Sequence, residues 1–142
     1  MSDYDTDILS WSECQAELLR RRAAGELVND VELDWLNIAE EIESVGRSEF
    51  RACESLLRQA LLHMLKAEAW PLSPAVAGWR GEAVRFRHDA ADAYAPSMRQ
   101  RLDMAKIYRR ALQELPDTID GQPPLRVPDV CPVTLDELLA EP

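Results

Sequence analysis

Hydrophobic residues recur at three- and four-residue steps along residues 34–69, the longest regular pattern in the chain. This spacing is typical of one face of an amphipathic α-helix. Asp34 is a suitable N-cap, and Leu33 and Ile38 are spaced as a hydrophobic staple. A helix of about 36 residues would extend about 54 Å at 1.5 Å per residue, with Gly46 as its one weak point. The apolar positions are Trp35, Ile38, Ile42, Val45, Cys53, Leu56, Ala60 and Met64.

Three further stretches carry the same helical periodicity. We expect a helix over about residues 5–24, capped by Asp5 or Thr6 and stopped at Gly25. The pattern then predicts helices over about 76–94 and 97–115. Four main helices joined by short links predict an all-α fold, an antiparallel bundle in a single domain spanning residues 1–142.

Residues 116–142 form a different kind of segment, a proline-rich C-terminal arm. Its five prolines up to Pro132 exclude a helix there and favour extended conformations. Thr134 and Glu137 then match a capping box, which predicts a short terminal helix. Because this helix carries Leu135, Leu138 and Leu139, we expect the arm to dock on the helical domain.

The charge distribution restricts the classes of partner. The net charge is −10, which disfavours a general nucleic-acid or anionic-membrane binder. Residues 1–50 carry 13 acids and 4 bases, whereas residues 51–115 carry 7 and 11. Three cysteines that are far apart fit reduced thiols, and no signal peptide or membrane-spanning run is evident. We therefore expect an acidic, soluble protein of the cytoplasm that binds neither nucleic acid nor membrane.

Several motifs recur in the order found in one bacterial family. Glu40-Glu41-Ile42-Glu43-Ser44 follows Leu33-Asp34-Trp35, and later come Leu61-Leu62-His63, Trp79-Arg80 and Cys131-Pro132. Together with Tyr4-Asp5 and Gln15-Ala16-Glu17-Leu18-Leu19-Arg20, they make the chain resemble the family called domain of unknown function 29. The chain departs at Ala67, where members often have tryptophan. The resemblance implies a small all-helical bacterial protein and supplies no activity.

Six side chains form the candidate polar cluster: Asp34, Glu40, Glu41, His63, Arg80 and Arg87. Arg80 and Arg87 flank the apolar seam of the third predicted helix, so they are expected to pair with Glu40 or Glu41. Such pairs would fix helix register; a pocket for an anionic or amide-bearing ligand is the alternative. A structural histidine donating to a carbonyl is the preferred interpretation of His63, and a general base is the alternative.

No recognisable catalytic set accompanies these residues. Glu-x-x-His pairs of the kind used by di-metal bundles are missing, since Gln59 stands four residues before His63. The sequence shows no phosphate-binding loop and no hydrolase elbow. We therefore predict a non-catalytic interaction or regulatory protein without metal or cofactor, most simply a homodimer formed along the long helix, with a further protein partner possible. The alternative is a small hydrolase or metal-dependent enzyme using Glu40 or Glu41, His63 and an arginine.

Overall fold

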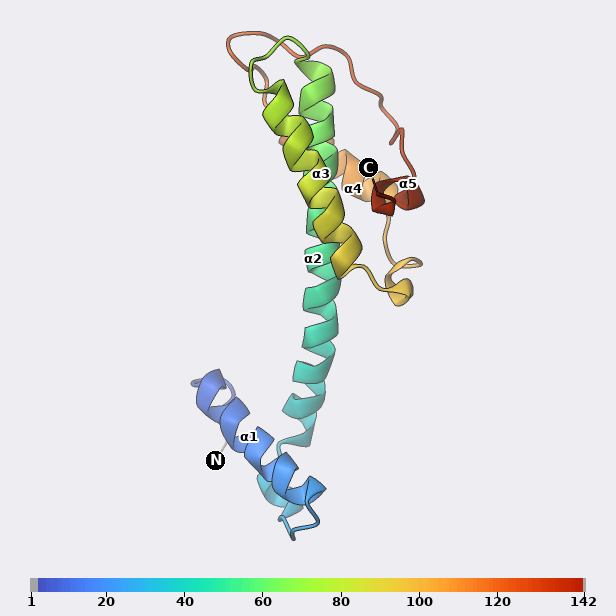
Figure 1. The fold of residues 1–142 in the computed structure, drawn as a ribbon. Helices are drawn as coiled ribbons and strands as arrows, with labels where there is room; N and C mark the ends of the chain where they lie inside the picture. Colours follow the sequence, from blue (N-terminus) through green and yellow to red (C-terminus); the bar gives the residue numbers. More distant parts are fainter. Residues whose placement is uncertain (1–2, 142) are drawn as a thin grey trace. The chain divides into compact units, whose positions relative to one another are not determined.

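The computed structural model describes residues 3–141, and its regular structure is helical (Figure 1). The α-helices are α1 (Ile8–Ala23), α2 (Trp35–Ala69), α3 (Val76–Ala93), α4 (Met104–Glu114) and α5 (Leu135–Leu139). Two 3₁₀ turns, η1 (Asp30–Glu32) and η2 (Pro96–Met98), lie between them. No strand occurs within residues 3–141, where Ile119 and Gln122 form one isolated bridge. The predicted all-α fold with four main helices and a short terminal helix is confirmed.

The helix ends follow local capping chemistry, and two of them differ from the prediction. Asp7, rather than Asp5 or Thr6, caps α1 by accepting the backbone N–H of Ser10. The fourth helix begins at residue 104 instead of 97, because the Asp103 carboxylate accepts the N–H of Lys106 and starts a new helix there. Gly25 follows α1 with φ +86°, the left-handed conformation expected of a glycine that ends a helix.

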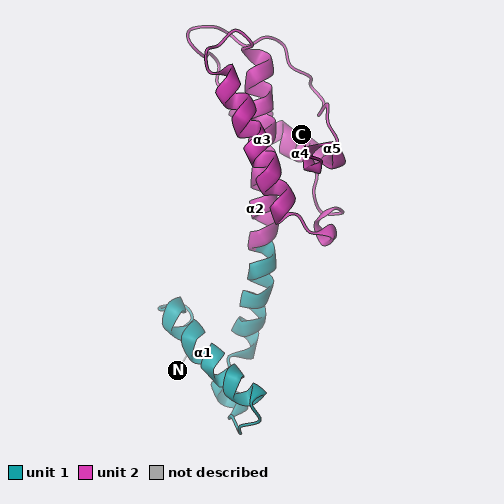
Figure 2. Ribbon diagram, in the orientation of Figure 1, with its two compact units in different colours: residues 1–47 teal, residues 48–142 magenta. Residues whose placement is uncertain are grey.

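The chain divides into two compact units, residues 1–47 and residues 48–142 (Figure 2). Helix α2 contributes its first part to unit 1 and the remainder to unit 2. The expectation that residues 1–142 behave as a single domain, with the arm docked on it, stays a prediction.

Unit 1 has a small apolar core where α1 meets the residues around the start of α2. The periodic positions Trp11 and Leu18 of α1 are buried together with Leu33 and Ile38. Leu33 and Ile38 are the two residues of the predicted hydrophobic staple, and their shared burial agrees with that role. This arrangement positions the polar side chains at the start of α2.

Unit 2 is built around the C-terminal part of α2, alongside which α3 runs (Figure 1). Cys53 and Ala60 of the predicted apolar stripe are buried, whereas Leu56 and Met64 of that stripe are only partly buried. The buried face of α2 is shifted by one residue, to Leu57, Leu61 and Leu65, and α4 adds Ile107, Tyr108 and Ala111. In α3, Val76, Ala83 and Ala90 are buried at seven-residue intervals, as expected for a helix with one covered face. The remaining buried members of this core include Leu62, Met98, Leu102, Leu135 and Leu138.

The C-terminal arm crosses unit 2 and ends in α5, which packs against α3. The Thr134 hydroxyl accepts the N–H of Glu137, so Thr134 is the N-cap of α5, which is one of the two bonds of the predicted capping box. Leu135 and Leu138 are buried in the core of unit 2. The Tyr108 hydroxyl donates to the backbone carbonyl of Pro128 and attaches the extended part of the arm to α4.

Candidate functional site

A polar network surrounds Asp34 at the start of α2, within unit 1. One carboxylate oxygen of Asp34 accepts both the Trp11 indole N–H at 3.0 Å and the Asn37 amide N–H at 2.8 Å. The buried Gln15 side chain accepts the backbone N–H of Asp34 and donates to the carbonyl of Glu32. Because buried polar groups are costly unless hydrogen-bonded, these contacts fix the approach of α1 to α2. Asp34 therefore has a structural role that its sequence position as an N-cap only partly indicates.

Glu40 and Glu41 also have partners within unit 1. The Arg47 guanidinium lies 2.6 Å from Glu40 and 3.8 Å from Glu43. Glu41 accepts a hydrogen bond from the Tyr4 hydroxyl at 2.6 Å, and the Tyr4 ring packs edge-on against Trp11. This hydrogen bond, followed by burial and by the charge of Glu41, raises the pKa of Tyr4 to about 12.

The raised pKa predicts a pH dependence of stability. Since the pKa is about 12 in the folded chain and 10.0 for a free tyrosine, the hydrogen bond contributes fully below pH 10.0 and its contribution is lost as the pH rises towards 12. We expect Tyr4→Phe to show a smaller loss of stability across this interval than the wild type. Denaturant melts at several pH values measure the difference, and equal losses for both proteins would contradict it.

His63 lies on α2 within unit 2 and makes the contacts of a structural histidine. Its Nδ1–H donates to the Gln59 carbonyl at 2.8 Å, and its ring packs against Phe86 of α3 with centroids 5.2 Å apart. The pKa of the nearby Glu82 carboxyl is lowered, mainly by the hydrogen bond from Arg85 and to a smaller extent by the electrostatic contribution of His63. The expected carbonyl bond of His63 is thus present.

Arg87 of α3 binds the C-terminal end of α5. Its guanidinium donates to three backbone carbonyls, those of Glu137 at 2.8 Å, Leu138 at 3.1 Å and Ala140 at 3.2 Å. Carbonyls at the end of a helix lack partners within the helix and carry the negative end of its dipole, so a cation is stabilising there. Arg80, one of the other candidates, is exposed on the same helix.

Arg87 and Arg80 therefore offer a matched comparison. Arg87→Met should destabilise the protein by about 1–3 kcal/mol, because hydrogen bonds to a charged group are lost and carbonyls of α5 are left with fewer partners. Arg80→Met removes an exposed arginine from the same helix and should stay within about 0.5 kcal/mol of the wild type. Thermal melts of both variants make the comparison, and equal melting temperatures would mean that the Arg87 contacts do not hold α5.

The six candidate residues thus divide between the units, Asp34, Glu40 and Glu41 in unit 1 and the other three in unit 2. Glu40, Glu41 and Arg87 each contact a partner in their own unit. The expected arginine–carboxylate bridges, which would join the two units, stay a prediction. Within residues 3–141, no three His, Cys, Asp or Glu side chains gather closely enough to share a metal ion. No helix among these residues is long and apolar enough to cross a membrane.

Cys53, in the core of unit 2, carries a thiol that could in principle act as a nucleophile. It is fully buried, and its thiol lies 3.7 Å from the Ala90 carbonyl. Burial raises the pKa of the Cys53 thiol, with a smaller contribution from Glu54. Because the thiolate is the reactive form, this thiol is suited to packing rather than to attack on a substrate.

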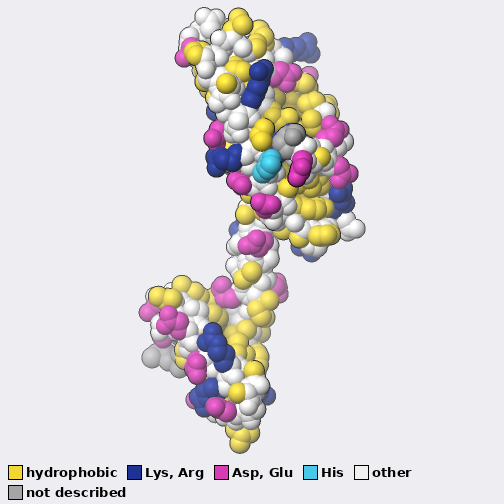
Figure 3. Space-filling model, in the orientation of Figure 1, with side chains coloured by type: hydrophobic (Ala, Val, Ile, Leu, Met, Phe, Trp, Pro, Cys, Tyr) yellow, Lys and Arg dark blue, Asp and Glu magenta, His cyan; other side chains and the backbone are white. Residues whose placement is uncertain are grey.

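The N-terminal part of α2 presents an uncovered apolar face, which we call the α2 face and define as Trp35, Ile42 and Val45. Exposed fractions are 48% for Trp35, 68% for Ile42 and 65% for Val45, and the adjacent Leu36 is 86% exposed. Hydrophobic side chains are visible at the surface along this part of α2 in Figure 3. Trp35 and Leu36 also line a groove of about 720 Å³ beside α1. Exposed apolar side chains that gather on one side of a helix are candidates for an interaction site.

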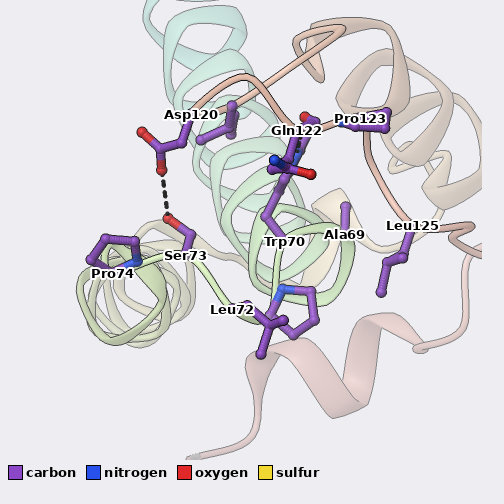
Figure 4. Close-up of a pocket in the computed structure, with 11 residues that line it drawn as sticks. Ala69, Trp70, Leu72, Ser73, Pro74, Asp120, Gln122, Pro123 and Leu125 are labelled. Carbon is purple, nitrogen blue, oxygen red and sulfur yellow. Dashed lines mark hydrogen bonds between the residues drawn. The ribbon is translucent and has the colours of Figure 1, made fainter.

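A second apolar feature lies in unit 2, where α2 ends and the arm passes. This Trp70 cleft has a volume of about 230 Å³ and is lined mainly by Trp70, Pro71, Leu72, Pro74, Pro123 and Leu125 (Figure 4). The Trp70 indole N–H donates to the Gln122 carbonyl at 2.8 Å, and the Leu125 N–H donates to the Ala69 carbonyl at 2.9 Å. These two bonds hold the arm against the end of α2.

Comparison with known proteins places the chain in a family. The sequence profile of Domain of unknown function DUF29 matches residues 4–142. The chain belongs to this family. No match exists among curated proteins.

A solved structure resembles this DUF29 chain over nearly its full length. It is the 1.45 Å crystal structure of an alpha-helical protein of unknown function from Rhodospirillum rubrum, 33% identical in sequence. The two structures match with a TM-score of 0.70, over 99% of this DUF29 chain and 91% of the other. The likeness supports the all-helical fold and carries no activity with it.

Sequence reasoning about this DUF29 chain missed two of the features described above. Gln15 and Trp11 were visible as helix residues, but no sequence pattern links them to Asp34. The Trp70 cleft joins residues 69–74 to residues 119–125, two segments without helical periodicity. The sequence offers one signal for the cleft: prolines follow Trp70, at Pro71 and Pro74, and recur in the arm. These prolines predict two loops, but they do not predict that the loops contact each other.

Proposed function

We propose that this DUF29 chain is a non-catalytic interaction protein that self-associates through the α2 face. The observation that carries the proposal is the exposure of Trp35, Ile42 and Val45 along a stripe whose remaining member, Ile38, is covered by unit 1. A stripe with steps of three and four residues is the seam that pairs helices with one another. Burying it in a second helix would remove large apolar side chains from water.

The chemistry around the α2 face favours a second copy of the chain as the occupant. On this face Trp35 and Ile42 are seven residues apart and Val45 follows three residues later, so two copies present matching spacings. Closed two-fold dimers, in which the same patch meets itself, are the commonest oligomers. Arg47 pairs with Glu40 and Glu43 within the chain, which reduces the repulsion between acidic side chains when two copies approach.

Gly46 supports the close approach of another helix. Apart from its chain neighbours and the adjacent turns of α2, a Cβ added at Gly46 would have no atom within 4 Å, so packing inside the chain does not require glycine there. Glycine inside a helix costs about 1 kcal/mol relative to alanine. A helix that packs beside Gly46 would gain from the missing side chain, because backbones can then come closer.

The experiment compares charged substitutions on and off the face. The double variant Ile42→Glu/Val45→Glu should elute as the monomer of 16.1 kDa in size-exclusion chromatography with light scattering, whereas the wild type should be a dimer. Val130→Glu, which changes an exposed side chain of the arm, should remain dimeric. A double variant that keeps the wild-type mass would exclude the α2 face as the interface.

A further inference from the structure

We infer that the Trp70 cleft binds an apolar side chain from a segment of another protein, with lysine or arginine next to that side chain. The cleft lies entirely within unit 2, so this inference is independent of self-association. Leu72 and Leu125 border it with exposed fractions of 96% and 58%. Exposed leucines beside an indole and three prolines form an apolar surface that an apolar guest would remove from water.

The walls of the cleft are held in place without a guest. In addition to the two bonds from Trp70 and Leu125, Ile119 and Gln122 exchange backbone hydrogen bonds of 3.0 and 2.9 Å. Ser73 donates to Asp120 at 3.3 Å and accepts the N–H of Ala75 at 3.2 Å. Figure 4 shows the Ser73–Asp120 bond on one side of Trp70 and Leu125 on the other. A preformed cleft loses little conformational freedom on binding.

The size of the cleft indicates what kind of guest it accepts. Its volume of about 230 Å³ is below the roughly 300–1,000 Å³ typical of sites for small molecules and cofactors. One or two aliphatic side chains fit such a space more readily than a cofactor does. The backbone of the guest segment would then pass over the rim, where the polar side chains of the cleft lie.

The charge at the rim favours a basic segment. Asp120 is the charged residue that lines the cleft, and within residues 3–141 its carboxylate has no salt-bridge partner. The one base of the arm, Arg126, follows Leu125 and lies 3.9 Å from the Asp129 carboxylate. Lysine or arginine beside the apolar guest residue would therefore face the Asp120 carboxylate, and this attraction raises the association rate and helps to select the partner. A protein segment in which lysine or arginine flanks an apolar residue is therefore the occupant that fits the cleft.

Short peptides test the inference on the full-length chain. Acetyl-Lys-Leu-Lys-amide is titrated into ¹⁵N-labelled protein, and the indole N–H signal of Trp70 is assigned by its loss in Trp70→Phe. We expect saturable shifts at Trp70, Leu72 and Leu125. The affinity for acetyl-Glu-Leu-Glu-amide should be lower than that for the basic peptide by about fivefold or more, which is the effect of an exposed ion pair. Acetyl-Lys-Gly-Lys-amide, which lacks the apolar side chain, should produce no saturable shift.

Two variants locate the site. Leu125→Glu should weaken binding of the Lys-Leu-Lys peptide by about tenfold or more, because a charge replaces apolar surface at the rim. Asp120→Asn keeps a residue that tolerates the left-handed backbone at φ +53° and should reduce the preference for the basic peptide over the acidic one. Preserved amide spectra of the free variants serve as the folding control.

Three outcomes would overturn the inference. One is equal binding of the basic and acidic peptides. Another is shifts that lie outside residues 69–74 and 119–125, or that persist in Leu125→Glu. The third is a Trp70 signal that moves with protein concentration in the absence of peptide, which would identify a second copy as the occupant of the cleft.

Discussion

Replacing Leu138 with alanine should lower the melting temperature by roughly 10 °C, since Leu→Ala in a core costs about 2–5 kcal/mol and 1 kcal/mol shifts a domain of this size by about 3–5 °C. Leu138 is only 1% exposed although only four residues of the sequence follow it. Its side chain belongs to the same buried cluster as Leu57 and Tyr108. The large effect would show that α5 is part of the core of unit 2.

The control for Leu138 comes from the same arm. Val130 is 78% exposed, so Val130→Ala should leave the melting temperature within about 2 °C of the wild type. Circular dichroism melts of the two variants at equal protein concentration make the comparison. If both variants melt with the wild type, α5 does not contribute to the stability of unit 2 in solution.

Replacing Trp11 with alanine should cost about 3–5 kcal/mol, because a large buried side chain is removed from a small core. The substitution also removes the indole N–H that Asp34 accepts, although Asn37 still donates to that carboxylate. Trp35→Ala is the matched control: Trp35 is half-exposed on the α2 face, so its loss should weaken self-association more than folding. Denaturant melts that give equal costs for Trp11→Ala and Trp35→Ala would contradict the assignment of Trp11 to the core.

Leu138 and Trp11 lie in different units, so their variants also test the prediction of a single domain. If residues 1–142 unfold cooperatively, calorimetry should show one transition that both substitutions move to lower temperature. Two transitions, each displaced by only one of the substitutions, would mean that the units unfold separately.

Much of the fold was accessible from periodicity and capping chemistry. The stripe of residues 34–69 predicted α2 to within one residue of its observed bounds, Trp35–Ala69. Thr134 and Glu137 predicted α5, because the side-chain hydrogen bond of a capping box is local in sequence. The predicted start of the fourth helix was wrong, because the helical spacing of apolar residues continues through Met98 and Leu102. Both side chains are buried, but Met98 belongs to a 3₁₀ turn and Leu102 to a loop. Periodicity records which residues are buried and does not distinguish a helix from turns that bury the same positions.

The candidate site was less accessible, because side-chain partners far apart in sequence leave no periodic trace. Arg87 was identified as a residue beside the apolar seam, yet its partners are backbone carbonyls near the end of the chain. Carbonyls are present at every position, so no residue type indicates them. Tyr4 and Glu41 likewise pair across 37 positions of sequence.

Sedimentation equilibrium of the wild-type protein tests the central claim most directly. Across a range of concentrations up to tens of micromolar, the account predicts a mass that rises to about 32 kDa, twice the 16.1 kDa of one chain. Added salt should favour the dimer, because it screens the repulsion between two chains of net charge −10. A mass that stays at 16.1 kDa throughout, at low and at high salt, would contradict self-association through the α2 face.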